Sequence, residues 1–119
     1  MTRNSNLPIS LKRALEQRSL LKVISGLSNF DHARVARVAR AAGNGGAEML
    51  DIACSPDLVR LAIQESGLPI CVSSVEPDLF PAAIEAGASM VEIGNFDSFY
   101  EQGRYFDSSE VLALTSYTR

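Results

Sequence analysis

The chain contains few of the residues that build disulfide frameworks and metal centres. Its 119 residues include two cysteines, one histidine and no tryptophan. Cys54 and Cys71 form no C-x-x-C pair and are too few for a disulfide scaffold, so a reducing compartment is indicated. His32 has no second histidine at a metal-ligand spacing. We therefore predict no metal site, and the sequence assigns no cofactor.

Long apolar runs and an excess of positive charge are missing as well. No run approaches the roughly 18 apolar residues of a membrane span, and the N-terminus leads into no apolar signal core. A net charge of -3 gives no electrostatic footprint for nucleic acid. We therefore expect a soluble protein of the cytosol or of an equivalent stroma, with neither nucleic acid nor a membrane as its partner.

What the chain does have is a repeated phrase. Gly46-Ala47-Glu48-Met49-Leu50-Asp51-Ile52 returns as Gly87-Ala88-Ser89-Met90-Val91-Glu92-Ile93. Each copy reads as a glycine that closes a helix, followed by a short apolar strand with one carboxylate inside it. A carboxylate inside a strand is costly unless it faces a polar site or a partner. The repeat therefore predicts an enzyme-like scaffold of βα units that carries carboxylates near its strand ends.

Helical and strand patterns alternate along the chain. Strands are predicted at 20–26, 48–53, 70–74 and 90–93, and the helices between them at 31–42, 56–66 and 77–87. A helix at 8–18 precedes this series, and residues 95–106 form a long connection with at most one helical turn. A capping-box spacing, Asp107 to Glu110, then opens a last helix.

This order predicts an α/β fold of one domain, residues 1–119, with an extra N-terminal helix before four parallel (β/α) units. No G-x-G-x-x-G follows the first strand, which argues against a dinucleotide fold. The even spacing suits a TIM barrel, which needs eight units and about 250 residues. We expect four of the eight units, a half-barrel, with either a missing C-terminal half or a homodimer to complete it. An open flavodoxin-like sheet is the alternative.

Three charged residues inside the strands are the candidate catalytic groups. Strand alternation aims Asp51 and Glu92 the same way, and in a barrel they would share one interior layer. Such a pair can act as acid and base, hold a hydroxyl or bind a cation, or it can be a structural ion pair. Lys22 is the natural partner. It would serve either as a base or Schiff-base former, or as an ion-pair partner of a carboxylate such as Glu92.

Smaller polar residues lie where the predicted strands end. Ser25, Ser73, Ser74 and Asn95 stand at the carboxyl ends of three strands. Chemistry in parallel barrels is located at these ends. We therefore expect these four residues to line the rim of a binding site for a small-molecule ligand. For Asn95, a plain helix cap is the alternative to ligand binding.

Four blocks of sequence resemble a known family. They are Lys22–Leu27 with Asn29-Phe30-Asp31, then Gly46-Ala47 with Asp51-Ile52-Ala53, then Leu68–Pro77, and finally Met90–Tyr100 with Gln102-Gly103-Arg104. Together they resemble a conserved reading frame of cyanobacteria and algal plastid genomes, a domain of unknown function assigned to aldolase-type TIM barrels.

The resemblance spans the chain from about residue 20 to its C-terminal end. It implies a barrel about twice as long, of which this chain is the N-terminal half, in a cyanobacterial cytoplasm or plastid stroma. It supplies no catalytic residues. We therefore expect an enzyme acting on a small, phosphorylated or unphosphorylated metabolite at the carboxyl ends of the strands. The alternative is a non-enzymatic barrel for metabolite binding or regulation.

Overall fold

The computed structural model describes residues 7–94 and 96–119. The elements in chain order are α1 (Ile9–Glu16), β1 (Lys22–Gly26), α2 (His32–Asn44), β2 (Met49–Ala53), α3 (Pro56–Ser66), β3 (Ile70–Ser74), the 3₁₀ segment η1 (Pro77–Leu79), α4 (Phe80–Glu85), β4 (Met90–Ile93), the 3₁₀ segment η2 (Phe96–Gln102) and α5 (Ser108–Thr118). Each expected strand and helix is present, with ends that differ by a few residues.

The strands form one parallel sheet in the order β1-β2-β3-β4. Consecutive strands are therefore neighbours, and each connection passes through a helix on the same side. This sequential order differs from that of a flavodoxin-like sheet, in which the first strand is interior. The α/β fold with four parallel units is confirmed, and its arrangement is that of half a TIM barrel.

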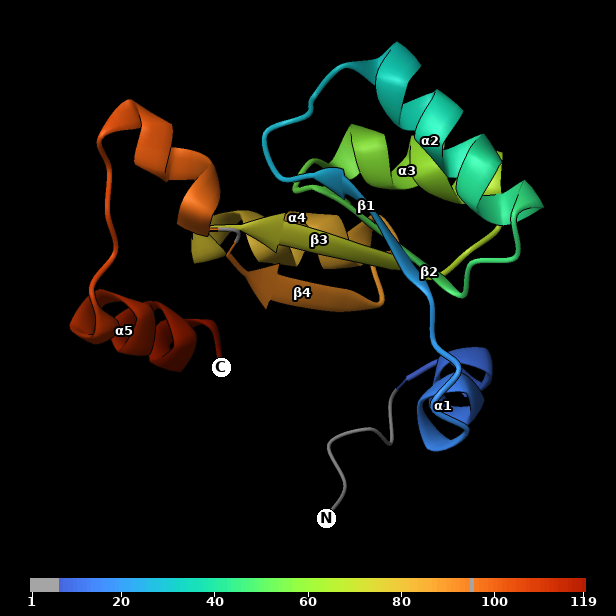
Figure 1. Cartoon of the computed structure of the whole chain (residues 1–119), viewed down its shortest axis with the longest axis horizontal. Coiled ribbons are helices and arrows are strands. Elements are labelled where there is room, and N and C mark those ends of the chain that lie inside the picture. The colour runs from blue at the N-terminus through green and yellow to red at the C-terminus, as the bar shows by residue number, and fades with distance from the viewer. Residues whose placement is uncertain (1–6, 95) are drawn as a thin grey trace.

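Helices cover one face of the sheet. Figure 1 shows α2, α3 and α4 packed along it, and their apolar stripes meet the strand residues Leu50, Ile52, Ile70 and Val72, all 0% exposed. Burying each such side chain contributes roughly 1.5–3 kcal/mol. This helix-covered face holds the main hydrophobic core.

Within residues 7–94 and 96–119, the opposite face, which we call the concave face, is covered only at the amino ends of its strands. There Leu11 of α1 packs against Met49 and Cys71 in a second, smaller cluster. Figure 1 shows α1 beside these amino ends and α5 at the other side of the molecule, beyond β4. The register between strands puts Lys22 and Ile24 of β1 on this same face as Met49 and Asp51 of β2.

Two predicted helices have different shapes in the structure. The first ends at Glu16 and not at residue 18, because Arg18 adopts a left-handed φ of 56°, which a helix cannot continue through. The predicted helix 77–87 is split into η1 and α4. Pro81 has no N–H to bond back to residue 77, so the first turn closes as a 3₁₀ segment.

The two C-terminal segments also bear on the predictions. The connection 95–106 is more helical than expected, because η2 spans seven residues of it. The capping box is confirmed: the Asp107 side chain accepts a hydrogen bond from the Glu110 backbone N–H, and the Glu110 side chain accepts one from the backbone of Asp107.

Candidate functional site

Asp51 is the buried centre of a polar cluster on the concave face. It is the third of the five residues of β2, and its side chain is 4% exposed. Its neighbour on β3, Ser73, donates a hydrogen bond from Oγ to Asp51 Oδ1 over 2.7 Å. The carboxylate therefore lies at mid-strand and not at the strand end where we expected it, and Ser73 fixes its orientation.

Lys22 connects this buried carboxylate to a more exposed one. Lys22 Nζ lies 3.6 Å from Asp51 Oδ2 and donates a hydrogen bond over 2.8 Å to Glu92 Oε2. Lys22 is the first residue of β1, two residues before the one that pairs with Asp51, so its long side chain extends along the sheet to reach both carboxylates. The predicted pairing of Lys22 with Glu92 is confirmed.

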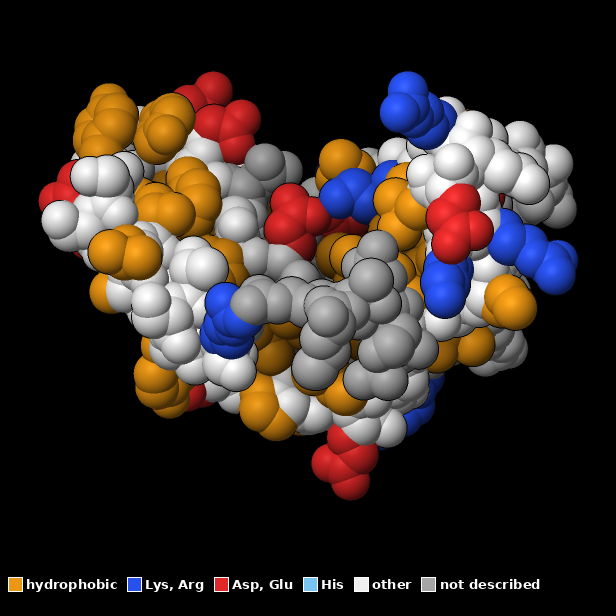
Figure 2. All heavy atoms as spheres, turned by 90° about the horizontal axis from the view of Figure 1, so that it is seen from below, with side chains coloured by type: hydrophobic (Ala, Val, Ile, Leu, Met, Phe, Trp, Pro, Cys, Tyr) orange, Lys and Arg blue, Asp and Glu red, His pale blue; other side chains and the backbone are white. Residues whose placement is uncertain are grey.

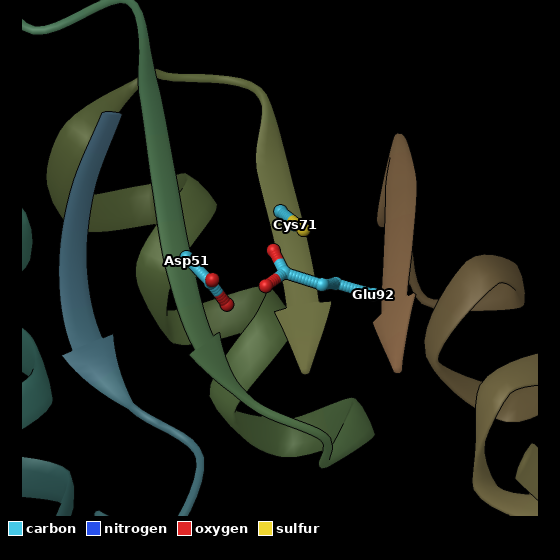
Figure 3. A group of neighbouring side chains, drawn as sticks. All are labelled: Asp51, Cys71 and Glu92. Atoms are coloured by element: carbon cyan, nitrogen blue, oxygen red, sulfur yellow. The ribbon is translucent and has the colours of Figure 1, made fainter. Parts of the chain in front are cut away.

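Glu92 and Cys71 complete the cluster. Figure 3 shows the Glu92 side chain extending from β4 across β3 toward Asp51, with Cys71 beside it on β3. Asp51, Cys71 and Glu92 each place one ligand-type atom within 4.8 Å of the others. The expectation that the carboxylates of β2 and β4 point the same way is therefore confirmed, and a thiol lies with them. That they share one interior layer of a barrel stays a prediction.

The burial of the cluster shifts the pKa values of its members. Burial, with the charge of Glu92, raises the pKa of Asp51 more than the Ser73 hydrogen bond and Lys22 lower it. Burial lowers the pKa of Lys22, but the hydrogen bond to Glu92 and the two carboxylate charges outweigh it, so this pKa rises. Burial, followed by the charges of Asp51 and Glu92, raises the pKa of Cys71 to about 12.

These directions separate the two roles considered for Lys22. A Schiff-base lysine needs a lowered pKa so that the amine is free at neutral pH. Lys22 has a raised pKa and remains an ammonium ion. Burial alone would make Lys22 easier to deprotonate, but two carboxylates within 4 Å stabilise its charge and outweigh that effect, so the base or Schiff-base role is not favoured. Cys71, with its raised pKa, is likewise a thiol and not a thiolate nucleophile.

The same cluster is a poor cage for a metal ion while Lys22 occupies it. Asp51, Cys71 and Glu92 are donors of the right kinds for a transition metal. However, the Lys22 ammonium already neutralises both carboxylates at 3.6 and 2.8 Å. A divalent cation would have to displace it and remove the proton of a thiol whose pKa is about 12. The arrangement favours the ion pairs and the hydrogen bond of Lys22 over metal binding.

Two of the three serines expected at the rim, Ser25 and Ser74, have hydrogen-bond partners outside this cluster. Ser25 Oγ accepts a hydrogen bond from Asn29 Nδ2 over 3.1 Å, and Ser74 Oγ accepts one from the Glu76 backbone N–H over 3.0 Å. They line two separate hollows, of about 570 and 230 Å³, on either side of the loop after β1. Asn95 lies outside the described residues. Of the four predicted rim residues, Ser73 alone is in contact with a charged member of the cluster within the described part of the chain.

The concave face is hollowed where charged side chains meet. Figure 2 shows acidic and basic side chains together in a recess, with apolar side chains beside it. Glu92, with a side chain 42% exposed, and Lys22, at 28%, are the accessible members of the cluster. A small molecule on this face would meet Lys22 and Glu92 first, with Asp51 behind them.

Cys71 is the member that sequence reasoning missed. We interpreted it as a small buried residue, which it is, at 1% exposed. Its position two residues before Ser73 on the same strand was the available signal, because strand alternation places both on the face that carries Asp51.

The comparisons with known proteins agree with the sequence blocks. A family described as "Protein of unknown function (DUF561)" matches residues 5–119. The chain is 48% identical over 106 residues to "Uncharacterized protein ycf23" of Cyanophora paradoxa, covering 88% of this chain and 44% of that protein. The proteins of the same name from Antithamnion sp. and Pyropia yezoensis are each 38% identical, over 82% and 83% of this chain and 35% and 36% of their own lengths.

Two facts complete the comparison. The chain spans less than half the length of these three relatives. In addition, no helix within residues 7–94 and 96–119 has the length and apolar character that crossing a membrane requires. With almost its whole length matched, the chain belongs to the DUF561 family, and it is similar to the ycf23 proteins of these algae.

Proposed function

We propose that the full-length protein is an enzyme with an aldolase-type TIM-barrel fold. Its Lys22–Asp51–Glu92 cluster would move a proton on a small carbonyl-containing metabolite. One observation carries this proposal. The Lys22 ammonium bridges a buried carboxylate and an accessible one on the open face of the sheet. A cation beside an accessible carboxylate is the arrangement that proton abstraction next to a carbonyl needs.

Each charged group has its own role in this mechanism. Glu92, the accessible carboxylate, takes a proton from the carbon next to the substrate carbonyl. The electron pair of that C–H bond moves to the carbonyl oxygen, where the Lys22 ammonium donates a hydrogen bond to the developing oxyanion. Protonated Glu92 then returns the proton to the same carbon, and the electron pair moves back from the oxygen to re-form the carbonyl. Glu92 begins and ends as a carboxylate, so no further reactant is needed.

Asp51 acts from behind as a positioning residue. Its contact with Lys22 at 3.6 Å and the Ser73 hydrogen bond at 2.7 Å support a role in holding the ammonium toward the open face. Because burial raises its pKa, Asp51 can also take up a proton without leaving its place. Ser25, Ser74 and Asn95 remain candidates for holding the rest of the ligand at the carboxyl ends of the strands.

Hydrogen–deuterium exchange tests the reaction class without knowledge of the natural substrate. The full-length protein is incubated in D₂O with a panel of small hydroxyaldehydes, hydroxyketones and their phosphates, and loss of C–H signal is followed by proton NMR. We expect Glu92→Gln to lower the exchange rate at least about 100-fold and Lys22→Met similarly, in line with the loss of one catalytic group. Lys22→Arg keeps the cation and should retain part of the rate.

The control is Lys12→Met, which removes an exposed lysine of α1 away from the cluster and should leave the exchange rate unchanged. If no member of the panel exchanges faster with protein than without it, or if Glu92→Gln exchanges at the parent rate, the proton-transfer assignment fails.

Metabolite binding without chemistry is the second candidate. It is favoured by the fact that Lys22 and the carboxylates already satisfy one another, as they would in a site that only recognises polar groups. Binding that is lost on Glu92→Gln, without any exchange in the parent protein, would support this second candidate. For either candidate we propose a cyanobacterial cytoplasm or plastid stroma, in keeping with the algal sources of the relatives.

A further inference from the structure

A polar hollow lies at the carboxyl ends of the strands, between two segments that are far apart in the sequence. It measures about 570 Å³ and is lined on one side by residues 25–31, which end β1 and follow it, and on the other by Ser98 and Gln102 of η2. Figure 1 shows both segments at the end of the sheet toward which the strand arrows point. Parallel α/β proteins bind small molecules at this end.

The walls of this hollow offer hydroxyl and amide groups. Ser25 Oγ accepts a hydrogen bond from Asn29 Nδ2 over 3.1 Å, which leaves the Ser25 O–H itself able to donate. Ser28, Ser98 and Gln102 add two further hydroxyls and an amide from exposed positions. Hydroxyls and amides both donate and accept hydrogen bonds, so they suit a ligand whose own groups do the same.

The charges that line the hollow cancel each other. Asp31 caps α2, and its Oδ1 accepts a hydrogen bond from the Arg34 backbone N–H over 3.0 Å. That bond, helped by the charge of the Arg34 side chain, lowers the pKa of Asp31, so the carboxylate is ionised at neutral pH. The carboxylate already occupies the N-terminal end of α2, where a helix can otherwise bind a phosphate. A phosphate in this hollow would therefore meet a like charge, with one guanidinium to balance both.

Phe30 gives the hollow an apolar wall. Its side chain is 54% exposed, and it lines both this hollow and the neighbouring one of about 230 Å³. The flat face of an aromatic ring can pack against C–H groups while hydroxyls on the same molecule bond to polar groups nearby. The loop that carries Phe30 is held in place, because the Asp31 backbone N–H donates a hydrogen bond to Asn29 Oδ1 over 3.3 Å. A wall that is already ordered costs less conformational entropy when a ligand binds.

We propose that this hollow binds an uncharged, hydroxyl-rich part of the ligand, such as the polyol chain of a sugar. Its mixed donors and acceptors, its balanced charges and its exposed aromatic ring all fit such a group better than a phosphate. The inference rests on the proposed function in one step, in which the same molecule presents its carbonyl group to Glu92. The substrate class is then a hydroxyaldehyde or hydroxyketone with several hydroxyl groups, and any phosphate that it carries is bound elsewhere.

Xylitol and inorganic phosphate are the probes that test this hollow. Xylitol is an uncharged polyol without a carbonyl group, so its binding does not depend on proton transfer. Each probe is titrated into isotope-labelled full-length protein while the amide signals of residues 25–34 and 98–102 are followed by NMR. We expect xylitol to shift these signals saturably, with an apparent Kd at least about tenfold below that of phosphate. Equal or tighter binding of phosphate, or no saturable shift up to about 0.2 M xylitol, would overturn the proposal.

Single variants then locate the bound polyol. Gln102→Ala and Phe30→Ala should each weaken xylitol binding about fivefold, the usual worth of one hydrogen bond or one packed ring. Gln64→Ala, on the exposed side of α3, is the matched control and should leave it unchanged. Xylitol binding that withstands both Gln102→Ala and Phe30→Ala would place the polyol elsewhere and overturn the proposal.

Asp31→Asn tests the charge argument separately. Asparagine still caps a helix but carries no charge, so this variant should bind phosphate at least about threefold more tightly than the parent and bind xylitol about equally well. Phosphate binding that does not change in Asp31→Asn would show that this carboxylate does not exclude anions, and would overturn the assignment of an uncharged ligand.

The failure of this inference differs from the failure of the proposed function. Saturable xylitol binding without deuterium exchange in any hydroxyketone would support the polyol site and remove the proton transfer. Deuterium exchange that proceeds at the parent rate in both Gln102→Ala and Phe30→Ala would keep the chemistry and remove the polyol site.

Discussion

The two copies of the repeated phrase form the same turn but lie in different surroundings. At their starts they are alike: Ala47 N–H bonds to the Ala42 carbonyl and Ala88 N–H to the Ala83 carbonyl, each over 3.1 Å. Along the strands they diverge. Asp51 has a side chain 4% exposed, and Glu92 one that is 42% exposed. The local sequence therefore determines the turn, and the neighbouring strands determine the burial.

This difference in burial arises because β4, unlike β2, has a described strand on one side only. β2 has a paired strand on each side and is buried at all five residues, whereas β4 has one neighbour and is buried at none of its four. Nevertheless β4 carries the apolar sequence of an interior strand, with Val91 and Ile93 where β2 has Leu50 and Ile52. Apart from Glu92, which points to the same face as Asp51, β4 carries neither the charges nor the proline that ordinarily prevent pairing at an edge strand. The sequence of β4 thus suits a position it does not occupy in this chain alone.

The largest contrast is expected between Ile52→Ala and Ile93→Ala in this chain. Ile52 is 0% exposed in the core, so its truncation leaves a cavity and should cost about 3 kcal/mol of unfolding free energy. Ile93 is only partly buried at the free edge and should cost about 1 kcal/mol. Urea unfolding followed by circular dichroism measures both. Equal losses would mean that the β4 edge is packed as tightly as the centre of the sheet, contrary to this structure.

The same pair of variants tests the proposal that the full-length protein forms a barrel. In the full-length protein, we expect the cost of Ile93→Ala to rise toward that of Ile52→Ala, because further strands would complete the packing around β4. A cost that stays at about 1 kcal/mol in the full-length protein would indicate that β4 is an edge strand there too.

The glycines that begin the two copies give the next largest effect. Gly46 has a φ of 81° with open space around it, and Gly87 has a φ of 121° with Ile63 Cδ1 2.8 Å from where a Cβ would stand. Gly46→Ala should cost about 1–2 kcal/mol from the left-handed backbone alone. Gly87→Ala should cost about 1 kcal/mol more, because the Ile63 side chain must also move. Thermal unfolding of both variants distinguishes them, and a smaller loss for Gly87→Ala would contradict this geometry.

The repeat also shows how far the sequence could take the site. Alternation along each strand was enough to predict that Asp51 and Glu92 point to the same face, because a strand has a fixed period of two. The position of Lys22 inside an apolar strand was enough to predict that it pairs with a carboxylate. The exact register between strands could not be predicted. It places Ser73 opposite Glu92 and Cys71 opposite Asp51, which brings a hydroxyl and a thiol into the cluster.

Local patterns likewise located the helices and strands but not every boundary. The proline and glycine signals marked the turns, while the strained Arg18 and the effect of Pro81 inside α4 changed where two helices begin or end. The half-exposed state of Glu92 depends on what covers β4, which no pattern within the strand contains.

Titration should report the burial of Asp51 in a way that mutation of the core cannot. Burial raises the pKa of Asp51 above its ordinary value of 3.8, so its protonated form is favoured in the folded state. Its contribution to stability is therefore fully present below the unfolded pKa and is lost as the pH rises through the folded pKa. Asp51→Asn, which keeps a polar partner for Ser73 and Lys22, should remove this loss.

The measurement is the difference between wild type and Asp51→Asn in unfolding free energy from about pH 3.5 to about pH 7. We expect wild type to lose stability relative to the variant as the pH rises, by at most about 1.4 kcal/mol per pH unit for one group. The difference is needed because Asp31 and Glu110 have lowered pKa values and contribute stability that is lost in the opposite direction, as the pH falls. A difference that is flat across this range would show that Asp51 is not desolvated in the folded protein.

The smallest effect is expected at Glu92, in the more exposed copy of the repeated phrase. Glu92→Gln in this chain removes one charge of the 2.8 Å pair with Lys22, and because the Glu92 side chain is 42% exposed, the loss should stay below about 1 kcal/mol. Solvent and salt screen such a pair, so the loss measured in about 0.5 M NaCl should be smaller still. In the full-length protein the same change should cost more and depend less on salt, because a covered Glu92 is no longer screened by solvent. Equal costs and equal salt dependence in this chain and in the full-length protein would mean that the Glu92 carboxylate is exposed to water in both. The difference in burial between Asp51 and Glu92 would then be a property of the full-length protein as well.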